Sequence, residues 1–456
     1  MHVRLLFAML VIPGSAQAAA DVFDIETSAG AVAEKVIAWR HDLHANPELG
    51  NREFRTAGIV AEHLRSLSFD SVQTGVAHTG VVGVLRGGKA GPVVALRADM
   101  DALPVTEQTG LPYASTVTAQ WRGQETGVMH ACGHDAHTAI LMGVAEVLAN
   151  MREEIPGSVK FIFQPAEEGA PPGEEGGAEL MVAEGVLGGD FAPGAIFGLH
   201  VAPFRAGSIG YRAGGMQAAS DGLEVVIKGR QTHGAMPWAG VDPVVVAAQV
   251  VSGIQNIVSR QIDITKAPAI VTFGSINGGN RGNIIPSQVK LTGTIRAFDP
   301  AMRNDIHERI RRIATMTAES HGATAEVTID RGYPVTRNDP ELTESMKPVL
   351  DRYALGGKAQ VIPPITASED FSYYANEIPG LFFALGVAPE GRGLGTAAPN
   401  HSPYFVVNDA VMHVGVKALA GVALEWLVQN APAASRTVPA GAASNVRGNL
   451  SGAKTR

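Results

Sequence analysis

The pattern of apolar residues changes near Arg212 and changes back near Asp330, and this break limits the possible folds more than any other feature. Between these points the pattern predicts six elements in the order β-α-β-β-α-β, which is typical of a ferredoxin-like unit. The predicted strands cover residues 222–228, 269–276, 288–298 and 325–329, and the predicted helices cover residues 241–260 and 301–321. We therefore predict that residues 212–330 form an inserted second domain.

On both sides of this insertion, strand patterns alternate with helix patterns, which indicates an α/β domain with a mostly parallel sheet flanked by helices. The predicted helices cover residues 25–67, 138–150, 178–186, 341–355 and 409–429, and the predicted strands cover residues 81–85, 93–96, 159–163, 195–199 and 381–385. We therefore expect a discontinuous first domain made of residues 21–211 and 331–430. A second domain also agrees with the length, because 456 residues exceed what one hydrophobic core usually serves.

The two ends of the chain differ in composition from the predicted domains. Residues 1–20 contain Arg4, an apolar run over residues 5–12 and the small-x-small motif AQA, which together are typical of a secretory signal peptide. That apolar run is shorter than the ~20 residues of a membrane-spanning helix, and we expect no later segment to be long, uniformly apolar and uncharged enough to qualify as one. Residues 431–456 are rich in Ala, Ser, Gly and Pro and predict a disordered tail. The expected location is periplasmic or secreted.

The charge of the chain argues against a nucleic-acid partner. Its formal net charge is -8, and removal of a signal that carries Arg4 and no acid would make it about -9. Nucleic-acid-binding domains are usually basic, with Lys and Arg gathered on one face. We therefore expect a small-molecule partner, with neither nucleic acid nor membrane.

Cys132 is the only cysteine of the chain, and it lies in the segment MHACGHDAH over residues 129–137. A single cysteine cannot form a disulfide within one chain, although exported proteins often use paired cysteines. Three interpretations remain open from this residue alone: a buried thiol, a nucleophile or a metal ligand.

Polar side chains follow the predicted strands at the edge where open α/β sheets bind their ligands. Asp99 and Asp101 follow one strand, the pair Glu167-Glu168 follows another, and His200 ends a third. Thiolate, imidazole and carboxylate groups bind borderline divalent metals, and a free carboxylate beside a metal-bound water is suited to act as a general base.

Each of these residues also has an ordinary structural interpretation. His200 would suit a hydrophobic core if it were bonded to the backbone, and His401 would suit an exposed loop. Another acidic pair, Glu174-Glu175, lies among prolines and glycines and predicts a solvated loop, whereas Glu167-Glu168 closes a buried strand. Cys132 and His134, with one glycine between them, can turn toward a common point. A single metal site would explain all of these positions together, and for that reason we favour it.

Six segments in this order resemble the M20 family of metallopeptidases, in particular its amidohydrolase branch of hippurate, N-acyl amino acid and auxin-conjugate hydrolases. The segments are MHACGHDAHTAIL, FIFQPAEEG, GLHV, THGAMPW, NIIP and NHSPYF. The resemblance covers residues 39–427. It implies two divalent metal ions and a water-activating base, Glu167. The implied metal ligands are Cys132, His134, Glu168, His200 and His401.

The resemblance also implies roles for three residues of the inserted domain, which in relatives is a lid that mediates dimerisation. His233 matches a lid histidine that stabilises the oxyanion, in the same active site or in that of a partner subunit. Asn283 and Arg296 match positions suited to hold a substrate carboxylate. The broader M20 pattern has a histidine where this chain has Asp99, which puts metal binding by Asp99 in doubt and agrees with a metal-binding role of Cys132. His130 and His137 are expected to support the site.

These observations predict metal-dependent hydrolysis of the amide bond of N-acyl amino acids or related small peptide-like conjugates. The alternatives are a metal-dependent carboxypeptidase or dipeptidase acting on short peptides, a cysteine hydrolase using Cys132 with His134, and a metal-binding protein without catalysis. A thiolate ligand favours zinc, whereas manganese, cobalt or nickel would suit the nitrogen and oxygen ligands. A homodimer or higher homo-oligomer through the inserted domain is a possible assembly.

Overall fold

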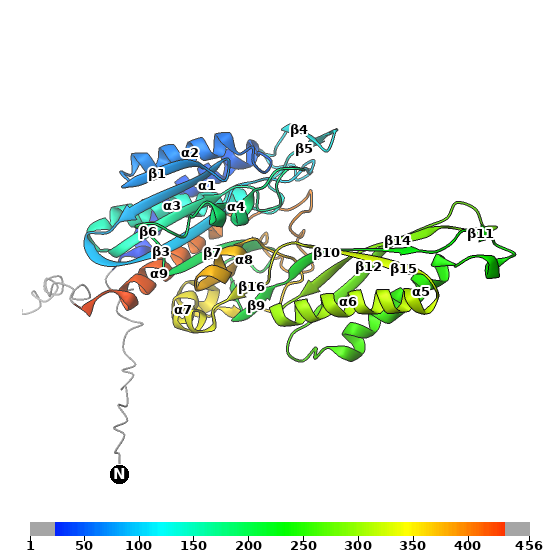
Figure 1. The fold of residues 1–456 in the computed structure, drawn as a ribbon. Helices are drawn as coiled ribbons and strands as arrows, with labels where there is room; N and C mark the ends of the chain where they lie inside the picture. The colour runs from blue at the N-terminus through cyan, green and yellow to red at the C-terminus, as the bar shows by residue number, and fades with distance from the viewer. Residues whose placement is uncertain (1–22, 434–456) are drawn as a thin grey trace, which may run out of the picture.

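The computed structural model describes residues 23–433, which form a main unit around an eight-stranded sheet and a second unit around a four-stranded sheet (Figure 1). The predicted signal peptide lies outside the described residues, and so does the predicted tail apart from residues 431–433.

The central strands of the main sheet are parallel, so their carboxyl ends meet at one edge. The strand order is β1-β2-β6-β3-β7-β18-β8-β17. β3 (Lys89–Asp99) pairs in parallel with both β6 (Pro156–Gln164) and β7 (Ala195–Ala202), and β18 (Gly380–Gly386) pairs in parallel with β7. The remaining strands are β1 (Ser71–Val76), β2 (Gly80–Arg86), β8 (Ile209–Tyr211) and β17 (Gln360–Val361). The predicted α/β class with a mostly parallel sheet is confirmed.

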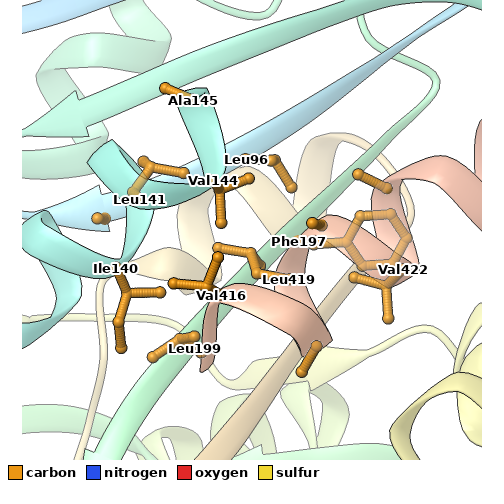
Figure 2. Close-up of a cluster of buried hydrophobic side chains, with 14 of the residues drawn as sticks. Leu96, Ile140, Leu141, Val144, Ala145, Phe197, Leu199, Val416, Leu419 and Val422 are labelled. Atoms are coloured by element: carbon orange, nitrogen blue, oxygen red, sulfur yellow. The ribbon is translucent and has the colours of Figure 1, made fainter. Parts of the chain in front are cut away.

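Helices cover both faces of this sheet because its buried strands are apolar on both sides. Val94 and Leu96 of β3 contribute to the core under α1 (Ile25–Ala45), α3 (His134–Asn150) and α9 (Met412–Asn430), whereas Ala95 between them belongs to the core on the opposite face. Figure 2 shows side chains of α3 and α9 meeting those of β3 and β7. The other helices of the unit are α2 (Phe54–Ser66), α4 (Gly177–Ala183), α7 (Pro340–Tyr353) and α8 (Phe371–Glu377).

The segment Asp409–Asn430, which contains α9, is long and apolar enough to cross a membrane by length and composition. The expectation that no segment after the N-terminal one would qualify is therefore wrong by that criterion. In this fold, 67% of its most apolar stretch is buried, and α9 packs against α1, α3, α7 and β3. A helix that is apolar all round is also the pattern of a buried core helix.

The second unit has its own sheet and its own hydrophobic core. Its elements are β10 (Ala219–Lys228), α5 (Pro243–Asn256), β12 (Ala269–Asn277), β14 (Gln288–Ala297), α6 (Pro300–Ser320) and β15 (Thr324–Arg331). The strand order is β12-β14-β10-β15, with antiparallel pairing throughout, and residues of α5 and α6 pack against the sheet. This is the β-α-β-β-α-β order predicted from the sequence. At its far end lie the short strands β11 (Thr232–His233) and β13 (Ile284–Ile285) (Figure 1).

The structure differs from the sequence prediction in the first helix and in several short strands. The single helix expected over residues 25–67 is two helices, α1 and α2. Pro47 disfavours a helical conformation in the residue before it, and Asn51 adopts a positive φ of 59°. The strands β4 (Thr118–Trp121), β5 (Gln124–Gly127), β9 (Gly214–Gln217) and β16 (Thr336–Asn338) were not predicted either, and neither were β1, β8 and β17. β1 has six residues that are mostly exposed, and the others have two to four residues, so they carry little periodic apolar pattern.

The close pairing of β3 and β6 depends on Gly157. Its φ is +97°, and a Cβ atom added there would lie 2.0 Å from the carbonyl oxygen of Pro92. Glycine is required at such a position because other residues are strained at positive φ and the two backbones leave no room for a side chain. Since β3 and β6 both end at the same edge of the sheet, this contact helps to set the positions of the residues that follow them.

We predict that Gly157→Ala lowers the free energy of unfolding of the main unit by more than about 1 kcal/mol. Gly30→Ala is the matched control, because Gly30 is an exposed position of α1 with open space around it. It should raise the free energy of unfolding by about 0.5–1 kcal/mol, since alanine restricts the unfolded chain. Denaturant unfolding of both variants measures this, and equal effects of the two substitutions would contradict the account.

Candidate metal centre

The candidate site is built where the carboxyl ends of β3, β6 and β7 meet the start of α3. The turn into α3 requires Gly133, whose φ is 94° and whose added Cβ atom would lie 2.3 Å from a methyl carbon of Val201. Without a side chain between them, Cys132 and His134 can both approach the sheet edge.

The structure brings all five predicted ligands together. The Cys132 Sγ atom lies 3.4 Å from His200 Nε2 and 3.2 Å from His401 Nε2. His401 Nε2 lies 2.9 Å from Glu168 Oε1. Five groups of possible ligand atoms lie within 4.8 Å of one another. Three of them contain at least two of the predicted ligands: Cys132, His134 and His200; Cys132, Glu168 and His401; and His134, Glu167 and Glu168. Cys132 therefore belongs to two of these groups.

Backbone and carboxylate contacts orient these ligands. The Asp101 carboxylate accepts a hydrogen bond from the main-chain N–H of Glu168 at 2.9 Å and lies 3.1 Å from His134 Nδ1. His200 Nδ1 lies 2.7 Å from the carbonyl oxygen of Val201, so it must donate, and Nε2 is left to face Cys132. These contacts select the ring nitrogens that point into the site, as is usual for metal-binding histidines.

His137 supports the site from behind, as expected for it. Its Nε2 atom accepts a hydrogen bond from the Val201 N–H at 2.8 Å, and its Nδ1 atom lies 2.6 Å from Asp99. The other carboxylate oxygen of Asp99 accepts a hydrogen bond from Arg97 at 2.7 Å. Both oxygens of Asp99 are thus engaged by protein groups, which agrees with the doubt about Asp99 as a ligand. His130 is also buried nearby, and its ring lies 6.5 Å from that of His44.

Acidic groups crowd this buried site. Burial, together with the nearby carboxylates of Glu369 and Glu168, raises the pKa of Glu167 well above its usual range. Burial and the same kind of negative neighbours, Glu168 and Glu167, raise the pKa of the Cys132 thiol. Burial opposes protonation of His134, but the charges of Asp99 and Asp101 outweigh it and raise the pKa of this histidine to about 10. All three shifts indicate an excess of negative charge that a cation would balance.

The residues present fit a divalent metal. One thiol, three imidazoles and adjacent carboxylates form a donor set suited to borderline divalent ions. His134 Nε2 is buried and, among the described residues, has no hydrogen-bond partner, although its ring is fixed through Nδ1. A buried nitrogen without a partner is costly, and coordination would satisfy it.

Several residues of the site were not predicted from the sequence. Tyr333 donates a hydrogen bond to the main-chain oxygen of Glu167 at 2.6 Å, and the N–H of Asp370 donates to the Glu167 side chain at 3.4 Å. Arg97 is fully buried and pairs with Asp370 at 2.7 Å and with Glu369 at 3.0 Å. The pair Glu369-Asp370 has the same form as Glu167-Glu168, but it precedes a helix instead of ending a strand, so strand ends did not indicate it.

Asn400 was also missed, although it lies next to His401 in the sequence. Its side-chain N–H groups donate to the carbonyl oxygens of Cys132 at 2.9 Å and Val201 at 3.1 Å. It therefore joins the three segments that carry Cys132, His200 and His401. The neighbouring His401 has a positive φ of 69°, a strained conformation that this bonding helps to hold.

The three predicted residues of the second unit do not join this group in the described chain. His233 is exposed on β11, at the end of the second unit far from β3 and β7 (Figure 1), and its Nδ1 accepts a hydrogen bond from the Ala235 N–H at 3.0 Å. Asn283 lies beside it, and its main-chain carbonyl oxygen accepts a hydrogen bond from the Gly234 N–H at 2.8 Å. Arg296 lies on β14 and donates to the Ile295 carbonyl oxygen at 3.1 Å.

Comparisons with known proteins agree with this geometry. The family model of peptidase family M20/M25/M40 matches residues 95–425. Thermostable carboxypeptidase 2 of Saccharolobus solfataricus is 38% identical over 395 residues, which cover 86% of this chain and 95% of that protein. N-acetylcysteine deacetylase of Bacillus subtilis is 36% identical over 391 residues, which cover 86% of this chain and 96% of that protein.

A matching solved structure is described as metal binding. The crystal structure of a Bacillus subtilis protein described as a dinuclear metal binding peptidase from the M20 family matches with a TM-score of 0.73 and 34% identity. The match covers 87% of this chain and 99% of that one. The fold of the present chain is therefore similar to that of a peptidase described as binding two metals, and its possible ligand atoms are clustered.

We predict that Asn400→Asp weakens metal binding about 10- to 100-fold, the usual effect of losing a residue that orients metal ligands. A carboxylate at this position would repel the two carbonyl oxygens that the amide now bridges. Competition with a chelator of known affinity measures the change, and Asn256→Asp on an exposed helix surface is the control. Unchanged affinity in Asn400→Asp would show that this bridge does not hold the ligands.

Proposed function

The chain belongs to peptidase family M20/M25/M40 and is a metal-dependent hydrolase, and we propose that it cleaves the amide bond of N-acyl amino acids or related small peptide-like conjugates. The products would be a carboxylic acid and an amino acid. The observation that carries this proposal is the position of Glu167, a buried carboxylate whose Oε2 atom lies 3.8 Å from His134 Nε2 beside the ligand groups.

The names of the two relatives both support hydrolysis of an amide bond in a small substrate. One is named a carboxypeptidase and the other a deacetylase of N-acetylcysteine, and both reactions hydrolyse an amide next to an amino acid carboxylate. Hydrolysis of short peptides is the corresponding alternative for this chain. A metal-binding protein without catalysis would have no use for a buried carboxylate beside its ligands.

In the proposed mechanism Glu167 moves the proton. When bound, the divalent ions supply Lewis-acid chemistry, polarising the amide carbonyl and lowering the pKa of water. Glu167 accepts the proton of the attacking water and passes it to the nitrogen of the leaving amine. Tyr333 and Asp370 hold the Glu167 main chain and side chain in place while the proton is transferred.

We propose that two divalent ions are held by Cys132, His134, Glu168, His200 and His401. A thiolate among the ligands favours zinc, and manganese, cobalt and nickel also suit the imidazole and carboxylate ligands. Cys132 belongs to two of the ligand groups and would be one of the residues that hold the ions. Coordination would also account for a thiol kept beside two carboxylates.

We predict that Glu167→Gln lowers kcat by about 10²- to 10⁴-fold, the usual contribution of a general base, while both metal ions stay bound. The amide has nearly the same shape as the carboxylate but cannot accept the proton. Glu153→Gln is the matched control, because Glu153 lies exposed and away from the site. Steady-state rates and metal content are measured together. Full activity of a metal-loaded Glu167→Gln protein would refute the role of this residue.

A cysteine hydrolase is the second candidate, because the Cys132 thiol lies within 3.4 Å of two histidines. Such an enzyme needs a thiolate of lowered pKa beside positive charge. Burial and the carboxylates of Glu168 and Glu167 raise the pKa of this thiol instead. The surroundings of Cys132 therefore favour a metal ligand over a nucleophile.

We also propose that the second unit is a lid and a dimerisation surface, and that His233 acts on the developing oxyanion. His233 lies far from the metal centre of its own chain (Figure 1), so it would act after a movement of the second unit or in the site of a partner subunit. Asn283, beside it, and Arg296 would contact the substrate carboxylate.

We predict that His233→Ala lowers kcat by about 10²- to 10³-fold, as loss of an oxyanion donor does. If His233 acts in the partner's site, a mixture of His233→Ala and Glu167→Gln chains should regain about a quarter of the wild-type rate, since half of randomly formed dimers are mixed and each has one complete site. Refolding the two variants together measures this. No recovery would indicate that His233 acts in the site of its own chain. An unchanged kcat of His233→Ala would refute the role of this residue altogether.

Finally, we propose that the protein acts in the periplasm or outside the cell after removal of residues 1–20. N-terminal sequencing of protein recovered from those compartments and from the cytoplasm tests this. An intact N-terminus found only in the cytoplasm would contradict it.

A further inference from the structure

Two short crossings join the second unit to the main unit, beside the small sheet of β9 and β16 (Figure 1). The first crossing, residues 218–220, leads from β9 into β10, and the second crossing, residues 332–335, leads from β15 to β16. The Ser220 N–H donates a hydrogen bond to the carbonyl oxygen of Tyr333 at 3.0 Å, so the two crossings are bonded to each other. They also approach closely, because a Cβ atom added to Gly332 would lie 2.4 Å from the carbonyl oxygen of Ser220.

The second crossing and the residue after it hold the two acidic pairs at the metal centre. The Tyr333 hydroxyl donates a hydrogen bond to the main-chain oxygen of Glu167 at 2.6 Å. Three residues further along, the hydroxyl of the buried Thr336 donates to the main-chain oxygen of Glu369 at 3.0 Å. One short segment between the two units therefore contacts one member of each acidic pair.

A buried ion cluster in the second unit fixes the other end of this crossing. Arg303 of α6 donates through Nη2 to the carbonyl oxygen of Gly332 at 3.0 Å. The same guanidinium donates twice to Asp221 near the start of β10, once at 3.0 Å, and His307 donates to Asp221 at 2.7 Å. Burial opposes ionisation of Asp221, but the hydrogen bonds from His307 and Arg303 outweigh it and lower its pKa to about 2. The cluster therefore ties both crossings to α6.

These contacts form a continuous path from α6 to the segment that carries Glu167. The guanidinium of Arg303 is planar, so its bonds to Asp221 and to Gly332 have a fixed relative orientation. Its pairing with Asp221 is buried, and such pairs are costly to break. A rotation of the second unit would therefore carry the second crossing with it, and Tyr333 would displace the main chain of Glu167. A displacement of about 1 Å at a catalytic group can lower a rate about 100-fold.

We propose that Arg303 and Tyr333 are positioning residues for Glu167, through which movement of the second unit changes the placement of the proposed base. The proposal rests on the proposed function, because Glu167 needs close placement only if it moves the proton. It gives the second unit an effect on the metal centre of its own chain that does not depend on His233.

A double-mutant cycle tests the path. Tyr333→Phe removes only the hydroxyl, and Arg303→Lys keeps the positive charge but loses the planar fork that reaches two partners. In steady-state hydrolysis of an N-acetyl amino acid, each should lower kcat about 10- to 100-fold, because the base is misplaced. KM and metal content should change little, since neither residue contacts substrate or metal ligands. The double variant should be no slower than the slower single variant, because both substitutions break the same path.

Two matched controls lie next to these residues but outside the path. Tyr373→Phe removes a neighbouring hydroxyl, which donates to Glu179 at 3.1 Å. Arg309→Lys changes an arginine of the same helix, which pairs with Asp305 at 2.8 Å. Both should retain the wild-type kcat. An unchanged kcat in Arg303→Lys would overturn the proposal, and so would a double variant whose loss equals the product of the two single losses.

Hydrogen exchange separates the path from the reaction. In metal-loaded Arg303→Lys protein, the main-chain amides of residues 166–169 should exchange at least about threefold faster than in the wild type, although Arg303 does not contact them. Gly332→Ala, which forces the crossings apart and leaves the ion cluster in place, should have the same effect and provides the test if Arg303→Lys does not fold. Faster exchange there would support the path even if the protein hydrolysed no N-acyl amino acid, an outcome that would end only the proposed function. Faster exchange confined to the second unit would overturn the path.

Discussion

Excess negative charge, buried at one edge of the main sheet, is the constraint on which the rest of this structure depends. Glu167, Glu168, Asp99, Asp101, Glu369 and Asp370 gather there around one fully buried guanidinium, that of Arg97. Burial together with Asp99 and Asp370 raises the pKa of Glu369 to about 8, although Arg97 opposes the shift. Charges in a protein interior are costly unless they are paired or bind metal. A fold that maintains such a cluster is suited to hold cations.

The register of the parallel strands brings this cluster of acidic residues together. Asp99 at the end of β3 is level with Gln164 at the end of β6, so the residues that follow the two strands come together. In the next parallel pair, His200 of β7 is level with Ala384 of β18, so it lies at the same edge of the sheet. The clustered polar side chains thus come from adjoining strands of one layer. The second unit contributes no described contact to this centre, so any role of its residues requires movement or a second subunit.

The sequence was sufficient to predict the parallel layer and the meeting of Cys132, His134, Glu168 and His200, because strand ends and a helix start are local patterns whose meeting point follows from topology. His401 joins them from a distant loop; its position after a predicted strand made it a candidate, and the resemblance to known hydrolases implied that it is a ligand. His137 was predicted as a supporting residue, but two others could not be predicted. Tyr333 and Asn400 act through single hydrogen bonds to main-chain oxygens of segments far away in the sequence. The break between α1 and α2 was missed because the apolar spacing continues past Pro47 and Asn51, where local backbone conformation ends the helix.

Metal analysis of the purified protein, coupled to a rate measurement on an N-acetyl amino acid before and after exhaustive chelation, tests the central claim most directly. The account predicts two divalent ions per chain, loss of hydrolysis as the ions are removed, and recovery when zinc, manganese, cobalt or nickel is added back. Hydrolysis that persists in metal-free protein and disappears on alkylation of Cys132 would contradict it.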